Sequence, residues 1–273
     1  MSLDQIQIEK VYARDPVTRV ILGAEPFEYG NPSESHAILF LHGFTSSPRE
    51  LRFLAEKMAS QNFYCQGLLF KGHGLTLQDL STTRFSDYYA QSEIALVALL
   101  KRHHRVSICG LSMGGLVGLN LALHHAVTGL LLIAPFLKPW GRTLGFSNDF
   151  LIGKVPLWGN ISKKVGGAID DPIAVKDHIA YHAMPVKAMV SVVEAAHDFR
   201  GKAMSILCPT LIHHAVNDKT SDFSGSVNLL TRLGSLDKTL KVYNRGNHVI
   251  TLDWERKEVE SGLVSWQIQH GHS

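Results

Sequence analysis

The chain has 273 residues, 45% of them hydrophobic and 19% charged, with a formal net charge of +3 when histidine is neutral. This composition is typical of a water-soluble globular protein with a sizeable core. Lysines and arginines are scattered along the chain, so no basic stripe indicates binding to nucleic acid. No apolar run reaches the roughly 18 residues that span a bilayer, so we expect no stable membrane insertion.

The cysteines and the start of the chain indicate a reducing compartment. Three cysteines, at positions 65, 109 and 208, lie within or beside apolar runs, and none belongs to a CxxC motif. An odd number of cysteines in such places favours buried, reduced thiols over disulfides or a metal site. The first ten residues lack the apolar core of a secretion signal. We therefore expect a cytoplasmic protein, and the sequence indicates neither a metal ion nor a cofactor.

Apolar runs and helical patterns alternate through the first half of the chain. Short apolar runs predict strands at residues 17–22, 37–41, 63–66 with its exit at 68–70, 106–110 and 130–134. Helical patterns follow at residues 48–58, 85–103 and 116–126. The first of these helices is predicted to start at Pro48, with Ser47 as its N-cap. Such alternation predicts an α/β fold, in which right-handed crossovers build a mostly parallel sheet with helices on both faces.

Residues 136–205 interrupt this alternation. They contain several aromatic residues and glycines but no clear strand pattern, and helical patterns return only at residues 174–180 and 186–197. We interpret the segment as a small helical cap inserted over the sheet. The alternative is a set of additional core helices on the flank of the sheet.

Regular alternation returns in the last quarter of the chain. Strands are predicted at residues 209–213 and 240–243, with a helix at 224–233 between them. The last helix is predicted to begin near Asp253, a suitable N-cap residue, and to run toward Gln267. No internal repeat or low-complexity tract divides the sequence. We therefore expect a single domain over residues 1–273, with the cap inserted at about 136–205.

A G-x-S-x-G motif lies between a predicted strand and a predicted helix. Ser112 is flanked by Gly110 and Gly114, and a run of β-branched and apolar residues precedes it. A serine at the tip of such a turn needs neighbours without a Cβ, because strand and helix pack together beneath it. The N-terminus of the following helix favours negative charge nearby. The motif therefore predicts a nucleophilic serine.

Two further residues follow predicted strands and complete a candidate triad. Asp218 comes shortly after the strand at 209–213, and His248 comes shortly after the strand at 240–243. Groups at the carboxyl ends of parallel strands gather at one edge of a sheet. His248 would then act as the base for Ser112, and Asp218 would orient it, with Asp222 as a nearby competitor.

An oxyanion hole needs two backbone N–H donors. One is expected from Met113, directly after the serine, and the other from Phe44 in the loop after the strand at 37–41. Two histidines near these residues also invite attention. His42 is expected to bond loop backbone, and His73 is expected to be structural because no second metal ligand lies at a usable spacing.

Five segments carry a family resemblance. They are L-H-G-F-T-S-S-P-R-E-L from Leu41, F-K-G-H-G from Phe70, G-L-S-M-G-G from Gly110, H-A-V-N-D from His214 and N-H-V-I-T-L-D-W-E-R from Asn247. In this order they resemble the carboxylesterase and monoacylglycerol-lipase branch of the α/β-hydrolase superfamily, notably small bacterial carboxylesterases. The resemblance implies the α/β-hydrolase fold, a small helical cap, and the same triad and oxyanion donors as those predicted from the residues.

Some residues depart from the pattern of that branch. Gly246-Asn247 precedes His248, where the family more often has a small residue directly before the histidine. His213-His214 stands where related chains more often carry other polar residues. The segment before the first matching motif is also longer than in the smallest esterases of the branch. None of these departures removes a catalytic group, but each bears on the choice of substrate.

The function expected from the sequence is hydrolysis of carboxylic esters through an acyl-enzyme intermediate. The substrate is expected to be a small molecule, either a short- or medium-chain acyl ester or a monoacylglycerol. The same fold and triad also serve thioesterases, C–C bond hydrolases and peptidases, and a non-catalytic binding protein can retain the fold. The sequence does not indicate an oligomeric state.

Overall fold

A seven-stranded sheet forms the centre of the molecule. The computed structural model describes residues 12–139, 161–163 and 167–271. The strands lie in the order β1-β3-β2-β4-β5-β8-β9 across the sheet. Their bounds are β1 Phe27–Tyr29, β2 His36–Leu41, β3 Tyr64–Leu68, β4 Arg105–Leu111, β5 Gly129–Ile133, β8 Thr210–Ala215 and β9 Lys238–Tyr243. Only β1 runs antiparallel to its neighbour in this sheet, so the prediction of a mostly parallel sheet is confirmed.

Alternate side chains of the buried strands form two hydrophobic layers, one on each face of the sheet. On β2, Ile38 and Phe40 belong to one layer, and Leu39 and Leu41 belong to the other. The first layer contains α1 (Arg49–Ala59) and α8 (Arg256–Gly271), and the second contains α3 (Phe85–Arg102), α4 (Met113–Ala122), α6 (Val186–Phe199) and α7 (Phe223–Arg232). Helices therefore cover both faces, as predicted. None of the helices that the structure describes has the length and apolar character needed to cross a bilayer.

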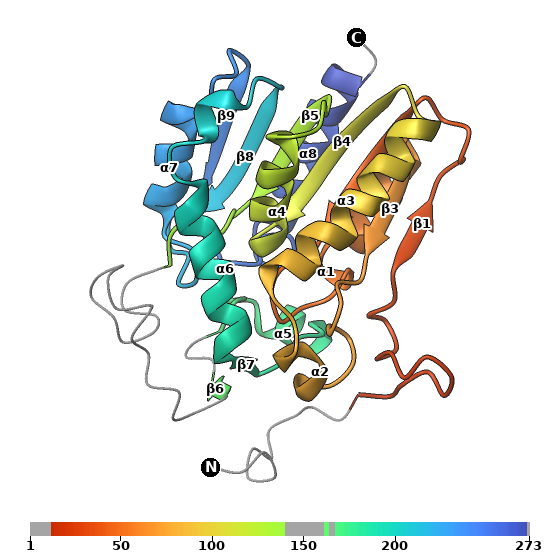
Figure 1. Cartoon of the computed structure of the whole chain (residues 1–273), viewed down its shortest axis with the longest axis vertical. Helices are drawn as coiled ribbons and strands as arrows, with labels where there is room; N and C mark the ends of the chain where they lie inside the picture. Colours follow the sequence, from red (N-terminus) through yellow and green to blue (C-terminus); the bar gives the residue numbers. More distant parts are fainter. Residues whose placement is uncertain (1–11, 140–160, 164–166, 272–273) are drawn as a thin grey trace.

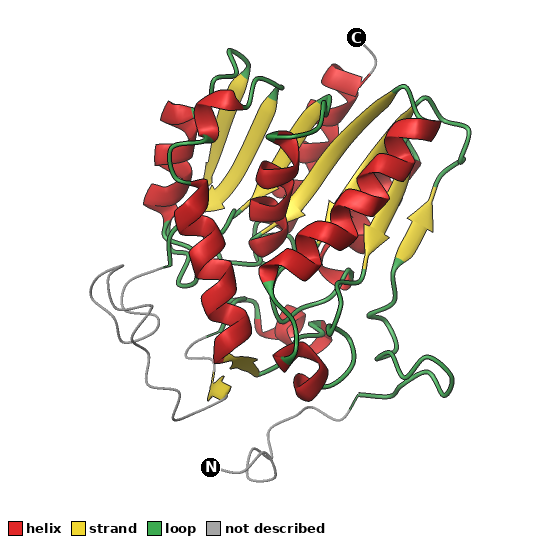
Figure 2. Ribbon diagram, in the orientation of Figure 1, coloured by secondary structure: helices red, strands yellow, loops and turns green. Residues whose placement is uncertain are grey.

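Short elements lie beyond the carboxyl ends of the parallel strands, at the bottom of Figures 1 and 2. They are α2 (Leu77–Ser81), α5 (Pro172–Asp177) and an antiparallel pair formed by β6 (Ile161–Lys163) and β7 (Ala183–Pro185). The helices α5 and α6 match the helical patterns predicted inside the interrupted segment. The pair β6–β7 corrects the expectation of no strand there. Residues 140–160 and 164–166 of the predicted cap lie outside the described residues.

Two local predictions are wrong, and one short helix was not predicted. Residues 17–22 form turns and a single bridge between Arg14 and Ile21, because Val17 is 86% exposed and its run has no sheet to join. Helix α1 is preceded by Pro48 without a side-chain cap, so Ser47 is not the N-cap. The helix α2 was missed, although Thr76 and its helix form a capping box that the sequence T-x-x-D spells out.

Candidate active site

Ser112 occupies the sharp turn between β4 and α4. Its φ of 56° is positive, a conformation that residues other than glycine adopt only when their surroundings enforce it. The neighbouring glycines leave no room for a side chain. A Cβ on Gly114 would lie 2.0 Å from the carbonyl oxygen of Leu41, and one on Gly110 would lie 2.5 Å from the carbonyl oxygen of Gly114. These contacts explain the spacing of the G-x-S-x-G motif.

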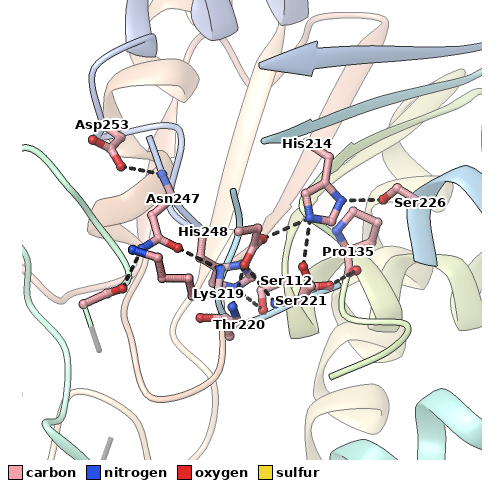
Figure 3. A network of polar contacts seen from close by, with 12 residues as sticks. Ser112, Pro135, His214, Lys219, Thr220, Ser221, Ser226, Asn247, His248 and Asp253 are labelled. Carbon is pink, nitrogen blue, oxygen red and sulfur yellow. Dashed lines mark hydrogen bonds and ion pairs between the residues drawn. The ribbon is translucent and has the colours of Figure 1, made fainter. Parts of the chain in front are cut away.

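Three side chains that are distant in sequence form a chain of hydrogen bonds (Figure 3). Ser112 Oγ lies 2.7 Å from Nε2 of His248, and Nδ1 of His248 lies 2.7 Å from Oδ2 of Asp218. Asp218 follows β8 and His248 follows β9, so both lie at the carboxyl edge of the sheet. This geometry suits transfer of the serine proton to Nε2 of the histidine.

The carboxylate of Asp218 accepts four hydrogen bonds. Its Oδ1 accepts the backbone N–H of Thr220 at 2.7 Å and that of Ser221 at 2.9 Å. Its Oδ2 accepts an N–H from His248 at 2.7 Å and one from His214 at 3.0 Å. Burial by itself would raise the pKa of Asp218, but the adjacent histidines and their hydrogen bonds hold that pKa below its ordinary value. Asp218 therefore remains ionised at neutral pH.

Asp222, the competing carboxylate, has a different role. It is the N-cap of α7, where its Oδ1 accepts the N–H of Ser224 at 2.9 Å. Its Oδ2 lies 3.0 Å from Nζ of Lys138 in a partly exposed ion pair. Asp222 therefore stabilises the start of the helix, and Asp218 is the carboxylate that contacts His248.

Asn247 connects the loops that carry Asp218 and His248 (Figure 3). Its Oδ1 accepts the N–H of Lys219 at 3.0 Å, and its Nδ2 donates to the carbonyl oxygen of Gly167 at 2.8 Å. The side chain itself is buried. Asn247, directly before the histidine, therefore cross-links the two loops, a role that sequence reasoning missed.

Asp253 supports the same region in an unexpected way. Its carboxylate accepts the N–H of Asn247 at 2.8 Å and the backbone N–H groups of residues 170–171 at 2.9 and 3.0 Å. The prediction that Asp253 caps the last helix is wrong, because α8 begins at Arg256. The carboxylate instead holds the loop before His248 against the segment that leads into α5.

The loop predicted to provide the second oxyanion donor lies beside Ser112. A Cβ on Gly43 would lie 3.5 Å from Cβ of Ser112. Phe44 is the next residue on this loop, and Met113 is the first residue of α4. Thr45 has a φ of 68°, so the chain turns sharply directly after Phe44. Both predicted donors therefore belong to segments next to the serine.

Two histidines hold this loop through backbone groups. His42 Nδ1 donates to the carbonyl oxygen of Gly43 at 2.8 Å, and its Nε2 accepts the N–H of Phe70 at 3.1 Å. Nε2 of His73 accepts the N–H of Thr45 at 3.0 Å. Burial lowers the pKa of His42 to about 4, so its ring is neutral. The structural roles expected for both histidines are confirmed, and the described residues contain no group of three or more ligands arranged to hold a metal ion.

Glu50 is a further buried group that sequence reasoning missed. Its side chain accepts the N–H of Gly43 at 3.2 Å and an N–H from Nε2 of His178 at 2.9 Å. Burial alone would raise the pKa of Glu50, but the contact with His178 lowers it to about 2. A glutamate in the first turn of a helix ordinarily interacts with the helix dipole, so its sequence position gave no sign of this contact.

The sequence matches the model of a known protein family. The family model for serine aminopeptidase, S33, matches residues 32–255, a segment that contains Ser112, Asp218 and His248. The chain belongs to this family. As a member of the S33 family it is a hydrolase, and the expected resemblance to α/β-hydrolases is confirmed.

Two relatives match the sequence of this S33-family chain over most of their lengths. A thermostable monoacylglycerol lipase of Bacillus sp. (strain H-257) is 28% identical over 252 residues, which cover 92% of this chain and 97% of that protein. A carboxylesterase of Bacillus subtilis (strain 168) is 24% identical over 247 residues, which cover 90% of this chain and 97% of that protein.

Solved structures show the same fold. One from the work on LipS and LipT, two metagenome-derived lipolytic enzymes, has a TM-score of 0.82 at 25% identity and covers 92% of this chain and 99% of that chain. The monoacylglycerol lipase of Paleococcus ferrophilus has a TM-score of 0.75 at 19% identity, covering 90% of this chain and 98% of that chain. These similarities confirm the α/β-hydrolase fold of the S33-family chain.

Proposed function

We propose that the chain hydrolyses carboxylic esters through an acyl-enzyme intermediate. Ser112 is the nucleophile, His248 is the general base, and Asp218 orients the imidazole. The observation that carries this proposal is the continuous hydrogen-bond chain of these three side chains, in which each link measures 2.7 Å. The positive φ of Ser112 supports it, because backbone strain of this kind is concentrated at functional sites.

The reaction follows from the positions of the protons. Nε2 of His248 takes the hydroxyl proton while Ser112 Oγ attacks the ester carbonyl, and the carbonyl oxygen becomes an oxyanion. The backbone N–H groups of Phe44 and Met113 stabilise that negative charge. The tetrahedral intermediate then collapses, and His248 returns the proton to the departing alcohol. A water molecule deprotonated by the same histidine releases the acid and restores the serine.

The relatives favour an ester as the substrate. The two relatives that match over most of their lengths are named a monoacylglycerol lipase and a carboxylesterase. The family description names aminopeptidases, and the same triad on this fold can also cleave thioesters and C–C bonds. We infer a small-molecule substrate, either a short- or medium-chain acyl ester or a monoacylglycerol.

We also propose that residues 136–205 form the cap of one domain that spans residues 1–273. The position of α5 and of the pair β6–β7 beyond the strand ends supports this assignment. A cytoplasmic location is supported by the thiols of Cys65 and Cys109, which are free and buried, with pKa values that burial raises.

Replacement of the serine tests the proposal directly. The Ser112→Ala variant is expected to fold with an unchanged unfolding temperature and to lose hydrolysis of p-nitrophenyl esters, because no other group can form the acyl-enzyme. A fluorophosphonate probe should label the natural chain at Ser112 and leave the variant unlabelled. The exposed Ser60 provides a matched control, and the Ser60→Ala variant should retain both activity and labelling.

A panel of substrates separates the competing activities. Esters of increasing acyl length, monoacylglycerols, an acyl thioester and an aminoacyl p-nitroanilide should be compared by kcat/KM. The proposal expects the highest value for an oxygen ester. Turnover by Ser112→Ala would contradict the assigned nucleophile, and a preference for the anilide would instead assign an aminopeptidase.

A further inference from the structure

A second histidine contacts the carboxylate that orients His248. Nε2 of His214 lies 3.0 Å from Oδ2 of Asp218, the same oxygen that accepts the N–H of His248. Both His214 and Asp218 have fully buried side chains. The reaction as described above does not use this contact.

The surroundings of His214 fix which of its ring nitrogens carries a proton. Nε2 faces two acceptors, Oδ2 of Asp218 and the carbonyl oxygen of Ser221, which lies 3.2 Å away. Neither acceptor can donate a proton, so Nε2 must donate. Nδ1 lies 2.7 Å from Oγ of Ser226, whose hydroxyl can donate to it. These contacts therefore place a proton on Nε2, which donates it to the carboxylate.

His214 also links Asp218 to rigid parts of the fold (Figure 3). Within the part of the chain that the structure describes, the other oxygen of the carboxylate accepts N–H groups from its own turn, those of Thr220 and Ser221. His214 by contrast belongs to β8, and its partner Ser226 belongs to α7. The orientation of Oδ2 is therefore set by a strand and a helix that pack together, and not by the turn alone.

We propose that His214 is a positioning residue of this active site, which holds Oδ2 of Asp218 toward His248 and limits the basicity of that oxygen. The inference rests on the proposed function, because it assigns a role relative to the proposed triad. A second N–H donor on the same carboxylate oxygen disperses the negative charge of that oxygen and weakens its interaction with an imidazolium. His248 then gives up its proton more readily, so it is available as a base at lower pH.

The expected effect of His214 on the pH profile involves one pair of titratable groups, Asp218 and His248. Among the described residues, the titratable groups linked to His214 are Asp218, which it contacts, and His248, which contacts Asp218. Uncharged side chains face it from the neighbouring elements, Phe223 and Ser226 from α7 and Val242 from β9. A change in the pH profile on substitution of His214 therefore reports on the carboxylate and its histidine partner.

The His214→Leu variant is expected to show two changes. The kcat should fall about tenfold with little change in KM, since a hydrogen bond to a charged group is lost from the carboxylate. The acidic limb of the kcat/KM profile should move to higher pH, by about half a unit or more, because an unshared Asp218 holds the proton on His248 more strongly. A variant with merely loosened packing would lower activity without moving the limb.

Two further variants separate positioning from packing. The His214→Gln side chain can place an N–H near the original Nε2, so this variant should recover most of the kcat and the original acidic limb. The His213→Leu variant is the matched control, because His213 precedes His214 on the same strand, is equally buried, and contacts Tyr243 at 2.9 Å instead of Asp218. It should lose stability while its pH profile stays unchanged.

The outcomes are distinguishable from a failure of the proposed function. Fluorophosphonate labelling of the natural chain at Ser112, measured against pH, establishes whether the serine is activated at all. If Ser112 labels but the limb for His214→Leu coincides with that of the natural chain, the inference about His214 is overturned and the proposed function stands. If the limb also moves in His213→Leu, the effect is a general loss of packing and the inference is again overturned.

Discussion

The two sides of the candidate site are held by different kinds of contact. On one side, the carboxylate of Asp218 is fixed by donors from β8 and from its own turn, and Asn247 joins that turn to the His248 loop. On the other side, the oxyanion loop is fixed by the rings of His42 and His73 and by the carboxylate of Glu50, which accepts the N–H of Gly43. The first side therefore positions a carboxylate that contacts His248, and the second side holds the backbone of a loop.

The oxyanion side also reaches the segment predicted to be part of the cap. The N–H of Tyr181 donates to the carbonyl oxygen of Thr45 at 2.8 Å, and His178 contacts Glu50 at 2.9 Å. The Asp218 side reaches that segment by way of Asn247, at Gly167. Substitutions near Asp218 should therefore mainly alter the chemistry. Substitutions near Glu50 should alter both stability and the placement of the oxyanion donors.

The largest expected effect comes from the carboxylate that contacts His248. The Asp218→Asn variant should keep its fold, but its kcat should fall by about 10⁴, because the amide no longer favours the histidine tautomer that accepts the serine proton. The measurement is ester hydrolysis at saturating substrate, with the unfolding temperature as a check on the fold.

Asp222 provides the control for that variant. Asp222→Asn keeps an N-cap residue and changes only a partly exposed ion pair, so the kcat should stay within about twofold of that of the natural chain. If Asp222→Asn lost activity as severely as Asp218→Asn, the assignment of Asp218 as the orienting carboxylate would be wrong.

A smaller effect, on both stability and activity, is expected from substitution of Glu50. The Glu50→Gln variant retains an acceptor for the N–H of Gly43 but loses the charged partner of His178. We expect a loss of about 2 kcal/mol in the free energy of unfolding, since both groups are largely buried. We also expect kcat/KM to fall about tenfold, because the oxyanion loop is less firmly held.

The exposed Glu56 on the same helix is the control for Glu50. Glu56→Gln should change neither the unfolding free energy nor kcat/KM measurably. Chemical denaturation and steady-state kinetics on both variants measure the two effects. Activity loss without any loss of stability in Glu50→Gln would contradict the contrast drawn between the two sides of the site.

The sequence predicts the parts of the molecule in which local pattern and sheet geometry agree. The predicted strands from residue 37 onward match the observed ones within two residues at each end, because most of them are buried and appear in the sequence as short apolar runs. Because the carboxyl ends of parallel strands meet at one edge of a sheet, the sequence also predicts that Asp218 and His248 lie together, and the structure finds them beside Ser112. Their catalytic roles remain a prediction for the variants above.

The missed features depend on contacts between distant residues. The partner of Glu50 lies 128 positions away, so no local pattern shows that its carboxylate is buried and paired. Asp253 has the sequence position of an N-cap, but its carboxylate accepts N–H groups from residues 170–171 and from Asn247. His214 likewise gains its role only when α7 packs against β8. Such contacts follow from packing, which the local sequence does not specify.

The smallest expected effect concerns the oxyanion side, where the free energy of unfolding is expected to depend on pH. The pKa of His42 is about 4 in the folded chain and near its ordinary value of 6.5 in the unfolded chain. Between these values the unfolded chain binds more protons, so acid favours unfolding and stability falls as the pH drops through this window. Glu50, with a pKa of about 2, extends the loss to lower pH. Lowering the pH from 6 to 5 should cost about 1 kcal/mol through His42 alone.

Replacement of the histidine isolates this contribution. The His42→Gln variant cannot take up the proton, so its unfolding free energy, measured by urea denaturation between pH 7 and pH 4.5, should fall less steeply than that of the natural chain. His104→Gln, which changes an exposed histidine, should leave the slope unchanged. Parallel slopes for His42→Gln and the natural chain would show that His42 is not held neutral by burial. The oxyanion loop would then contribute no acid-dependent loss of stability through His42, and the assignment of this effect to that side of the site would be wrong.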